Sequence, residues 1–244
     1  MTGELTFVHL YPRELGINGD VGNVLALRRR AEWRGLTVRV VDHGPGDELP
    51  EVAHLVHIGS GPASARAGVE ADVARIAPTL RAWADGGVPF LAIASGWQLL
   101  GRELVEADGR RVAGAGVFPT TATLGAKRFV GEVSGPSELG TVAGFENHSA
   151  VTTLDEGATP LVRIEGGHGE ARTDGVVAGE RIGTNLHGAF LPMNPHWADR
   201  LLDAALRLTG IQPADADSRM FEVDAEARRS REAIRRRLGL SHSA

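Results

Sequence analysis

The stretch from Phe90 to Gly101, FLAIASGWQLLG, constrains the fold of this chain more than any other. It begins as a short apolar run after Gly86-Gly87-Val88-Pro89 and continues into small residues and then Gln98-Leu99-Leu100. This order predicts a strand, a sharp turn and a helix. A turn of this kind lifts one side chain above the carboxyl edge of a parallel sheet, and here that side chain belongs to Ala94 or Ser95.

The residues on either side of this stretch alternate between strand and helix patterns. They predict a strand at Leu5 to Tyr11, a helix at Val24 to Arg34, strands at Leu36 to Val41 and Leu55 to Ile58, a helix at Val69 to Asp85 that Pro78 breaks or kinks, and a helix at Gln98 to Val105. The first three elements form a β-α-β unit with a right-handed crossover. We expect one large α/β domain.

Bulk composition excludes several classes of protein. A chain of 244 residues with 42% hydrophobic content can bury a substantial core. A net charge of −5 argues against a general nucleic-acid binder, and the absence of cysteine excludes disulfides and thiolate metal sites. No apolar run approaches the ~20 residues of a membrane span, and no basic-then-apolar leader opens the chain, so we expect a soluble cytoplasmic protein. No phosphate-binding loop or dinucleotide fingerprint is present, and we expect neither a cofactor nor a metal.

The turn itself carries a family resemblance. Residues 92–101 follow the pattern small-Ile-Cys-x-Gly-aromatic-Gln-x-Leu-Gly at every position except Ala94. In this they are similar to the class I glutamine amidotransferases of the cobyric acid synthase type. In that family the position of Ala94 holds the cysteine that attacks the glutamine side-chain amide. A methyl group cannot act as a nucleophile. Either the cysteine was replaced to trap an inactive form, or this is a natural member that has lost the glutaminase step.

A second departure from the family bears on that choice. After Gly59-Ser60-Gly61 the family continues with Gln-Asp or Glu-Asp, whereas this chain continues with Pro62-Ala63-Ser64-Ala65-Arg66-Ala67. The two departures together favour natural divergence. A serine hydrolase that uses Ser95 is disfavoured, because a serine elbow needs small residues two places to either side, and Ile93 and Trp97 stand there.

The N-terminal loop narrows the resemblance. Leu10-Tyr11-Pro12 followed by Gly19-Asp20-Val21-Gly22-Asn23 resembles the opening of the amidotransferase subunits of bacterial lipid II isoglutaminyl synthases. The plainer interpretation of the same loop is structural, with Asp20 or Asn23 capping the amides at the start of the helix that follows.

A second motif supplies a candidate general base. The run from Ile182 to Pro195 resembles the family pattern Gly-Thr-x-Leu-His-Gly-x-x-Leu-x-x-Asn-Pro, whose histidine, here His187, lies beside the nucleophile. A near-neutral pKa suits imidazole for this role. Larger class I enzymes orient the histidine with an acid two residues later, where this chain has Ala189. Without a thiol to activate, a purely structural histidine remains an alternative.

The resemblance implies further site residues. Gly59, Ser60 and Ser95 are the candidates for binding the oxyanion through backbone N–H groups. Arg128 and Gln98 are the candidates for binding substrate, with the Arg128 guanidinium matched to the carboxylate of glutamine. A solvated surface arginine is the alternative for Arg128. His148 in Gly-Phe-Glu-Asn-His matches the family, and we interpret it as structural.

The C-terminal region has a different composition. We expect an amidotransferase-like domain at residues 1–210, and at residues 211–244 a polar linker followed by a charged helix from Asp224 to Leu238. Its arginine-rich face is either simply solvated or a docking surface for an acidic partner.

Taken with these motifs, the resemblance implies a three-layer α/β fold with a mostly parallel sheet and helices on both faces. It implies a glutaminase subunit that supplies ammonia to a Mur ligase-like synthetase partner, in a heterodimer that amidates D-glutamate in lipid II. With Ala94 at the position of the nucleophile, the chain would be unable to hydrolyse glutamine. The alternative is a non-catalytic binding or scaffold protein that keeps the pocket and the partner surface.

Overall fold

A computed structural model describes residues 4–167 and 172–240 of the chain. Its helices are α1 (Val21–Glu32), α2 (Ala63–Asp85), α3 (Ser95–Leu100), α4 (Phe190–Met193), α5 (Pro195–Thr209) and α6 (Ser218–Arg237). Its strands are β1 (Glu4–Leu10), β2 (Thr37–His43), β3 (Leu55–Ile58), β4 (Phe90–Ile93), β5 (Glu103–Val105), β6 (Arg111–Ala113), β7 (Thr120–Ser137), β8 (Gly140–Leu154), β9 (Val162–Arg163), β10 (Thr173–Asp174), β11 (Val176–Ala178), β12 (Arg181–Thr184) and β13 (Leu186–His187). None of the described helices is long and apolar enough to cross a membrane.

The central sheet has six strands in the order β11-β12-β4-β3-β1-β2. All neighbouring pairs are parallel except β11 with β12. The predicted β-α-β unit is present, with β1 paired in parallel to β2 and α1 between them in the chain. The ends of β3 and β4 therefore meet at one edge of the sheet, where the turn after β4 lies.

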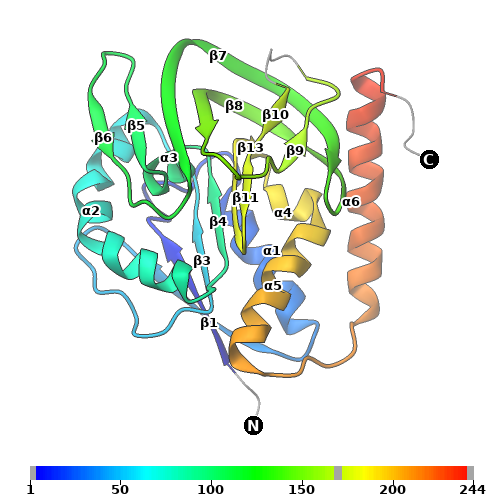
Figure 1. Ribbon diagram of the computed structural model, residues 1–244. Helices are drawn as coiled ribbons and strands as arrows, with labels where there is room; N and C mark the ends of the chain where they lie inside the picture. The colour runs from blue at the N-terminus through cyan, green and yellow to red at the C-terminus, as the bar shows by residue number, and fades with distance from the viewer. Residues whose placement is uncertain (1–3, 168–171, 241–244) are drawn as a thin grey trace.

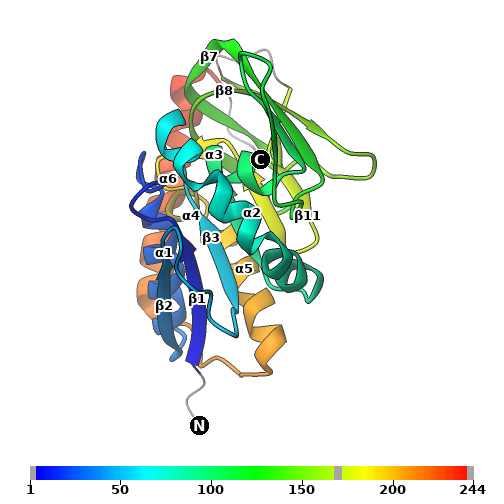
Figure 2. The same cartoon turned by 90° about the vertical axis from the view of Figure 1, so that its left-hand side faces the viewer.

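Side chains of the central strands alternate between two apolar layers. On β1, Leu5 and Phe7 pack in a cluster with residues of α1 and α5, while Val8 and Leu10 pack in a second cluster with residues of α2. Figure 2 shows α1 and α2 on opposite sides of β1 and β3. The prediction of an α/β fold with a mostly parallel sheet and helices on both faces is confirmed.

A second sheet has the strand order β13-β8-β7-β5-β6. Its long antiparallel hairpin of β7 and β8 curves over one end of the molecule (Figure 1). The register shifts between Leu124 and Phe129, and this irregularity bends β7 next to Arg128. Glycines at 125, 131 and 135 interrupt the apolar alternation in β7, so the sequence pattern does not predict an 18-residue strand.

The predicted helices differ from the observed ones in their limits, most clearly after the turn. The helix after the turn ends at Leu100, and residues 103–105 form β5. Gly101 is extended, and a side chain there would meet the Thr120 carbonyl oxygen at 2.8 Å, so the chain leaves the helix to pair with β7. Pro78 neither ends nor divides α2, which is one continuous helix with Pro78 on its exposed side.

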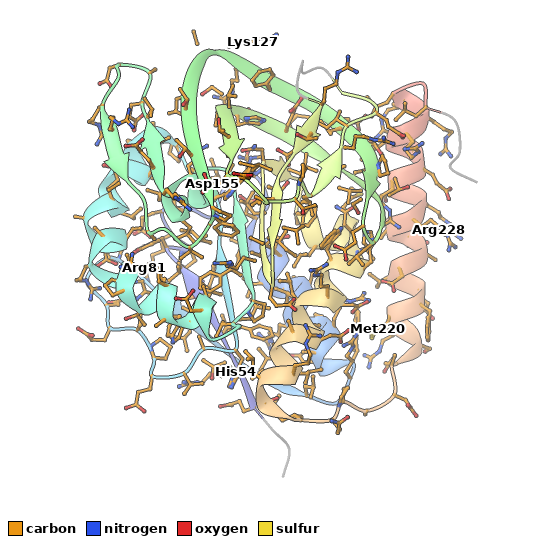
Figure 3. The ribbon with its side chains drawn as sticks, in the orientation of Figure 1. His54, Arg81, Lys127, Asp155, Met220 and Arg228 are labelled. Atoms are coloured by element: carbon orange, nitrogen blue, oxygen red, sulfur yellow. The ribbon has the colours of Figure 1, made fainter. Side chains whose placement is uncertain are left out.

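Helix α6 begins six residues before the predicted start and is capped by the Asp217 side chain. It runs along the body of the molecule in Figure 1 and buries Met220, which is labelled in Figure 3. Several of its charges pair with the rest of the chain, among them Asp224 with Arg30 and Arg237 with Glu132. The proposed domain boundary at residue 210 stays a prediction.

Candidate functional site

The turn between β4 and α3 is strained at Ala94. Its φ of 43° and ψ of −109° lie in a region that residues with a side chain rarely adopt. The N–H of Ala94 is held by the Thr184 carbonyl oxygen at 2.8 Å. Gly96 lets α3 approach β3, because a Cβ there would lie 2.4 Å from the Gly59 carbonyl oxygen. Ser95 is the first residue of the helix, so the lifted position is that of Ala94.

A cavity of about 320 Å³ lies above this turn, and we call it the front pocket. Six of the seven predicted site residues line it: Ser60, Ala94, Ser95, Gln98, Arg128 and His187. Gly59 does not line it. A Cβ on Gly59 would lie 2.3 Å from the Leu15 carbonyl oxygen, so this glycine lets the N-terminal loop pack against the end of β3.

Asp20 is the residue of the site that sequence reasoning missed. Its buried carboxylate does not cap α1. Instead Oδ1 lies 3.2 Å from His187 Nδ1, while Oδ2 accepts hydrogen bonds from Ser60 N–H at 3.0 Å and Ser60 Oγ–H at 2.6 Å. His187 Nε2 is buried and has no partner among the described residues. A carboxylate on one ring nitrogen leaves the other free to exchange a proton with a reacting group.

Packing around Ala189 explains why Asp20, rather than an acid at position 189, contacts His187. Ala189 adopts a φ of 47°, and the N-terminal loop packs directly against it. A Cβ on Gly22 would lie 2.9 Å from the Ala189 Cβ, and Gly188 N–H donates to the Asn18 carbonyl oxygen. The loop that carries Asp20 therefore fills the space that a longer side chain at 189 would need.

The predicted oxyanion donors differ in how they are engaged. The Ser60 amide already donates to Asp20. The Ser95 hydroxyl accepts from Gly61 N–H at 2.9 Å, which ties the loop after β3 to the turn. The backbone amide of Ser95 begins α3 and has no acceptor within its helix, so it is the predicted donor best placed to bind a developing negative charge.

Two guanidinium groups reach the front pocket. Arg66 is buried and neutralised by Glu106 at 2.5 Å, and it also contacts Gln98 Oε1 at 3.4 Å. Arg128 is exposed, follows the bend of β7 marked by Lys127 in Figure 3, and donates to Asn147 Oδ1 at 2.9 Å. Because Arg128 forms no ion pair with any described residue, it retains a positive charge for a ligand carboxylate.

The support beneath the site includes a buried histidine. His57 on β3 is fully buried, with Nε2 3.2 Å from the Asp20 carbonyl oxygen and Nδ1 3.1 Å from that of Leu91. Burial lowers the pKa of His57, which keeps the ring neutral at neutral pH. The loop that carries Asp20 thus rests on the central sheet through this ring.

His148 lines the front pocket but takes no part in the hydrogen bonds that join Asp20, Ser60 and His187. Its Nδ1 lies 3.0 Å from the Ala150 carbonyl oxygen, and its Nε2 lies 3.4 Å from Glu146 Oε2. These contacts agree with the structural interpretation of this histidine.

Comparisons with known proteins agree with the fold and the motifs. The family model for the CobB/CobQ-like glutamine amidotransferase domain matches residues 7–195. The lipid II isoglutaminyl synthase subunit GatD of Staphylococcus aureus is 31% identical over 220 residues, which cover 88% of this chain and 90% of that protein. The GatD subunit of Streptococcus pneumoniae is also 31% identical, over 84% of this chain and 81% of that protein.

A solved structure shares the fold. The crystal structure of a glutamine amidotransferase from Thermotoga maritima aligns with a TM-score of 0.55 at 16% identity, covering 94% of this chain and 93% of that one. Fold, strained turn and sequence matches converge, and this chain belongs to the CobB/CobQ-like glutamine amidotransferase family.

Proposed function

We propose that this chain is the glutamine amidotransferase subunit of a lipid II isoglutaminyl synthase, with a glutamine site that lacks only its nucleophile. The observation that carries the proposal is the front pocket. A strained turn, a histidine with a carboxylate behind it and an arginine that forms no ion pair with a described residue face this one cavity. The similarity to GatD subunits over most of both chains supports the choice of reaction.

With cysteine at position 94, the thiolate would attack the side-chain amide carbon of glutamine. His187 would take the thiol proton and pass it to the leaving nitrogen, so that ammonia departs and a glutamyl thioester remains. Water would then release glutamate and regenerate the thiol. Asp20 would hold the His187 ring in position, Ser95 N–H would bind the oxyanion, and Arg128 would bind the α-carboxylate.

The proposed partner is a Mur ligase-like synthetase, which would use ATP to activate the D-glutamate carboxylate of lipid II and would accept ammonia from this subunit. We propose a heterodimer located in the cytoplasm. The chain as written binds glutamine in this scheme without hydrolysing it, because Ala94 offers no nucleophile.

Ala94 itself favours a second candidate function. A family member that has lost its thiol can persist as a non-catalytic scaffold that keeps the pocket and holds the synthetase. Under this alternative, the departures at residue 94 and at residues 62–67 belong together as divergence of one site.

An assay on the assembled complex separates the two. The chain is produced with the Mur ligase-like synthetase of the same organism, and amidation of lipid II is measured with ATP and either ammonium chloride or glutamine. We expect the parent complex to use ammonium chloride only, and the Ala94→Cys complex to use glutamine as well. An Ala94→Cys complex that assembles and uses ammonium chloride but not glutamine would establish the scaffold, and a parent complex that uses glutamine would refute the role given to residue 94.

A further inference from the structure

A second cavity, of about 360 Å³, lies behind the front pocket. We call it the back cavity and define it by Trp97, Glu146, His148, Thr152, Asp174 and Asn185. Strand β8 separates the two spaces, because successive side chains of a strand point to opposite faces. Asn147 and Ser149 line the front pocket, whereas Glu146, Ala150 and Thr152 line the back cavity.

Three elements, α3, β7 and β8, contribute side chains to both spaces. On α3, Gln98 lines the front pocket and Trp97 the back cavity. Around β13, His187 lines the front pocket and Asn185 the back cavity. His148 lines both, so one side chain stands between the candidate reaction site and the space behind it.

Several buried polar atoms of the back cavity have no hydrogen-bond partner among the described residues. Trp97 Nε1, Glu146 Oε1, Asn185 Oδ1 and Thr152 Oγ1 are all buried, and none has a hydrogen-bond partner among the described residues. The side chains of Trp97, Glu146 and Asn185 are more than nine-tenths buried. Buried polar atoms cost free energy unless they are hydrogen-bonded, so this arrangement points to a small polar occupant.

The chemistry of these atoms defines the occupant. Asn185 Nδ2 is used by Asp174, which fixes its free Oδ1 as an acceptor. The free atoms therefore comprise one N–H donor on Trp97, two acceptors on Glu146 and Asn185, and a hydroxyl that can serve either way. Ammonia, with one lone pair and three N–H groups, can pair with all four atoms, and so can water, with two lone pairs and two O–H groups.

Charge excludes the other product of glutamine hydrolysis. The carboxylates of Glu146 and Asp174 would repel glutamate from the back cavity. Arg172, the one arginine among the described lining residues, is exposed to solvent, which screens its attraction for glutamate. Ammonium ion would satisfy the acceptors but would leave the Trp97 N–H unpaired, because it has no lone pair.

We propose that the back cavity is a holding site for ammonia, entered past His148 from the front pocket. This inference rests on the proposed function, since the ammonia is the product of the reaction proposed there. The residues of the back cavity are present whatever residue occupies position 94, so the chain as written can be tested.

The test uses the indole N–H signals of the isotopically labelled protein. The chain has four tryptophans, and Trp97→Phe identifies the signal of Trp97. Ammonium chloride is titrated at constant ionic strength against sodium chloride. We expect a saturable shift of the Trp97 signal with ammonium chloride alone, while the other three signals stay in place and report an intact fold. A Trp97 signal that does not move, or that moves equally with sodium chloride, would overturn the proposal.

Variants and pH sharpen this result. Glu146→Leu removes an acceptor and should weaken binding at least tenfold, and Thr152→Val, close in shape to the parent, should weaken it severalfold. Glu138→Gln is the matched control, because Glu138 is exposed and pairs with Arg200 outside the cavity. Raising the pH from 7 to 8 increases the fraction of neutral ammonia about tenfold, and the apparent affinity should rise by about the same factor. An affinity independent of pH, or unchanged by both cavity substitutions, would refute ammonia as the occupant.

This titration requires neither a thiol nor the synthetase. A negative titration beside a working Ala94→Cys glutaminase would remove the holding site and leave the proposed function standing. A positive titration beside an inactive Ala94→Cys variant would leave the holding site standing and remove the proposed function.

Discussion

The front pocket and the back cavity share three structural elements but differ in how their polar groups are paired. In the front pocket Asp20, Ser60 and His187 bond to one another, and Arg128 is steadied by Asn147. In the back cavity four buried polar atoms have no partner in the described part of the chain, against two in the front pocket, His187 Nε2 and Arg66 Nε. A site whose side chains hold each other is organised before its ligand arrives, which is what catalysis requires. A site with unsatisfied groups is completed by its occupant.

The largest expected effect comes from breaking the organisation of the front pocket at Asp20. In an Ala94→Cys background, Asp20→Asn keeps the size of the side chain but removes the charge that orients His187. We expect kcat for glutamine hydrolysis to fall by about 10²- to 10⁴-fold, by analogy with the loss of the orienting carboxylate in other nucleophilic triads. Steady-state kinetics measure this, with Asp203→Asn on the surface as the control. A fall of less than threefold would show that Asp20 is only a structural residue.

A smaller effect is expected at the substrate end of the same pocket. The chain as written cannot turn glutamine over in our scheme, so its dissociation constant can be measured at equilibrium by calorimetry. Arg128→Ala should raise that constant about 10- to 100-fold, the range expected for the loss of hydrogen bonds to a charged group. Arg39→Ala on β2, an exposed arginine that does not line the front pocket, should leave it unchanged. Equal binding by parent and Arg128→Ala would remove Arg128 from the site.

The smallest effect concerns two histidines, the buried His9 on β1 and the partly buried His196 on α5. Burial and the neighbouring His57 lower the pKa of His9 to about 3, and burial with the nearby Arg231 lowers that of His196 to about 4. Both rings are neutral when folded but take up protons when unfolded below pH 6.5, so their contribution to stability is complete above pH 6.5 and is lost as pH falls toward 4. The free energy of unfolding should fall by up to about 1.4 kcal/mol per pH unit for each histidine.

Denaturant titrations at pH 7, 6 and 5 measure this dependence. His9→Gln should reduce the slope, because it removes one of the two rings that take up a proton on unfolding. A stability that is flat from pH 7 to 5, or a slope that His9→Gln leaves unchanged, would contradict the assignment.

Sequence motifs predicted the front pocket better than they predicted its supports. The turn at Ala94, the histidine at 187 and the arginine at 128 each lie in a local pattern, and the structure brings all three to one cavity. Asp20 was interpreted as a helix cap because an aspartate in a glycine-rich loop before a helix has that signature. Its real partner, His187, lies 167 positions away in the chain, and no local pattern encodes a contact at that separation.

Local sequence patterns likewise predict one part of the fold and not the other. The central sheet follows from short apolar strands that alternate with helical patterns, and that alternation is local. The β7–β8 hairpin arises from pairing across a bulge, and the back cavity is lined by residues of α3 and β8 that are far apart in the chain, so both depend on the assembled molecule. Even the helix after the turn ends early because Gly101 meets Thr120 of β7.

The most direct measurement is the release of glutamate from glutamine by Ala94→Cys, alone and with the synthetase, compared with the same variant carrying His187→Ala. Our account predicts that the thiol alone restores hydrolysis and that removing the imidazole abolishes it again. An Ala94→Cys protein that folds and binds glutamine yet releases no glutamate in either setting would contradict the claim that the front pocket lacks only its nucleophile.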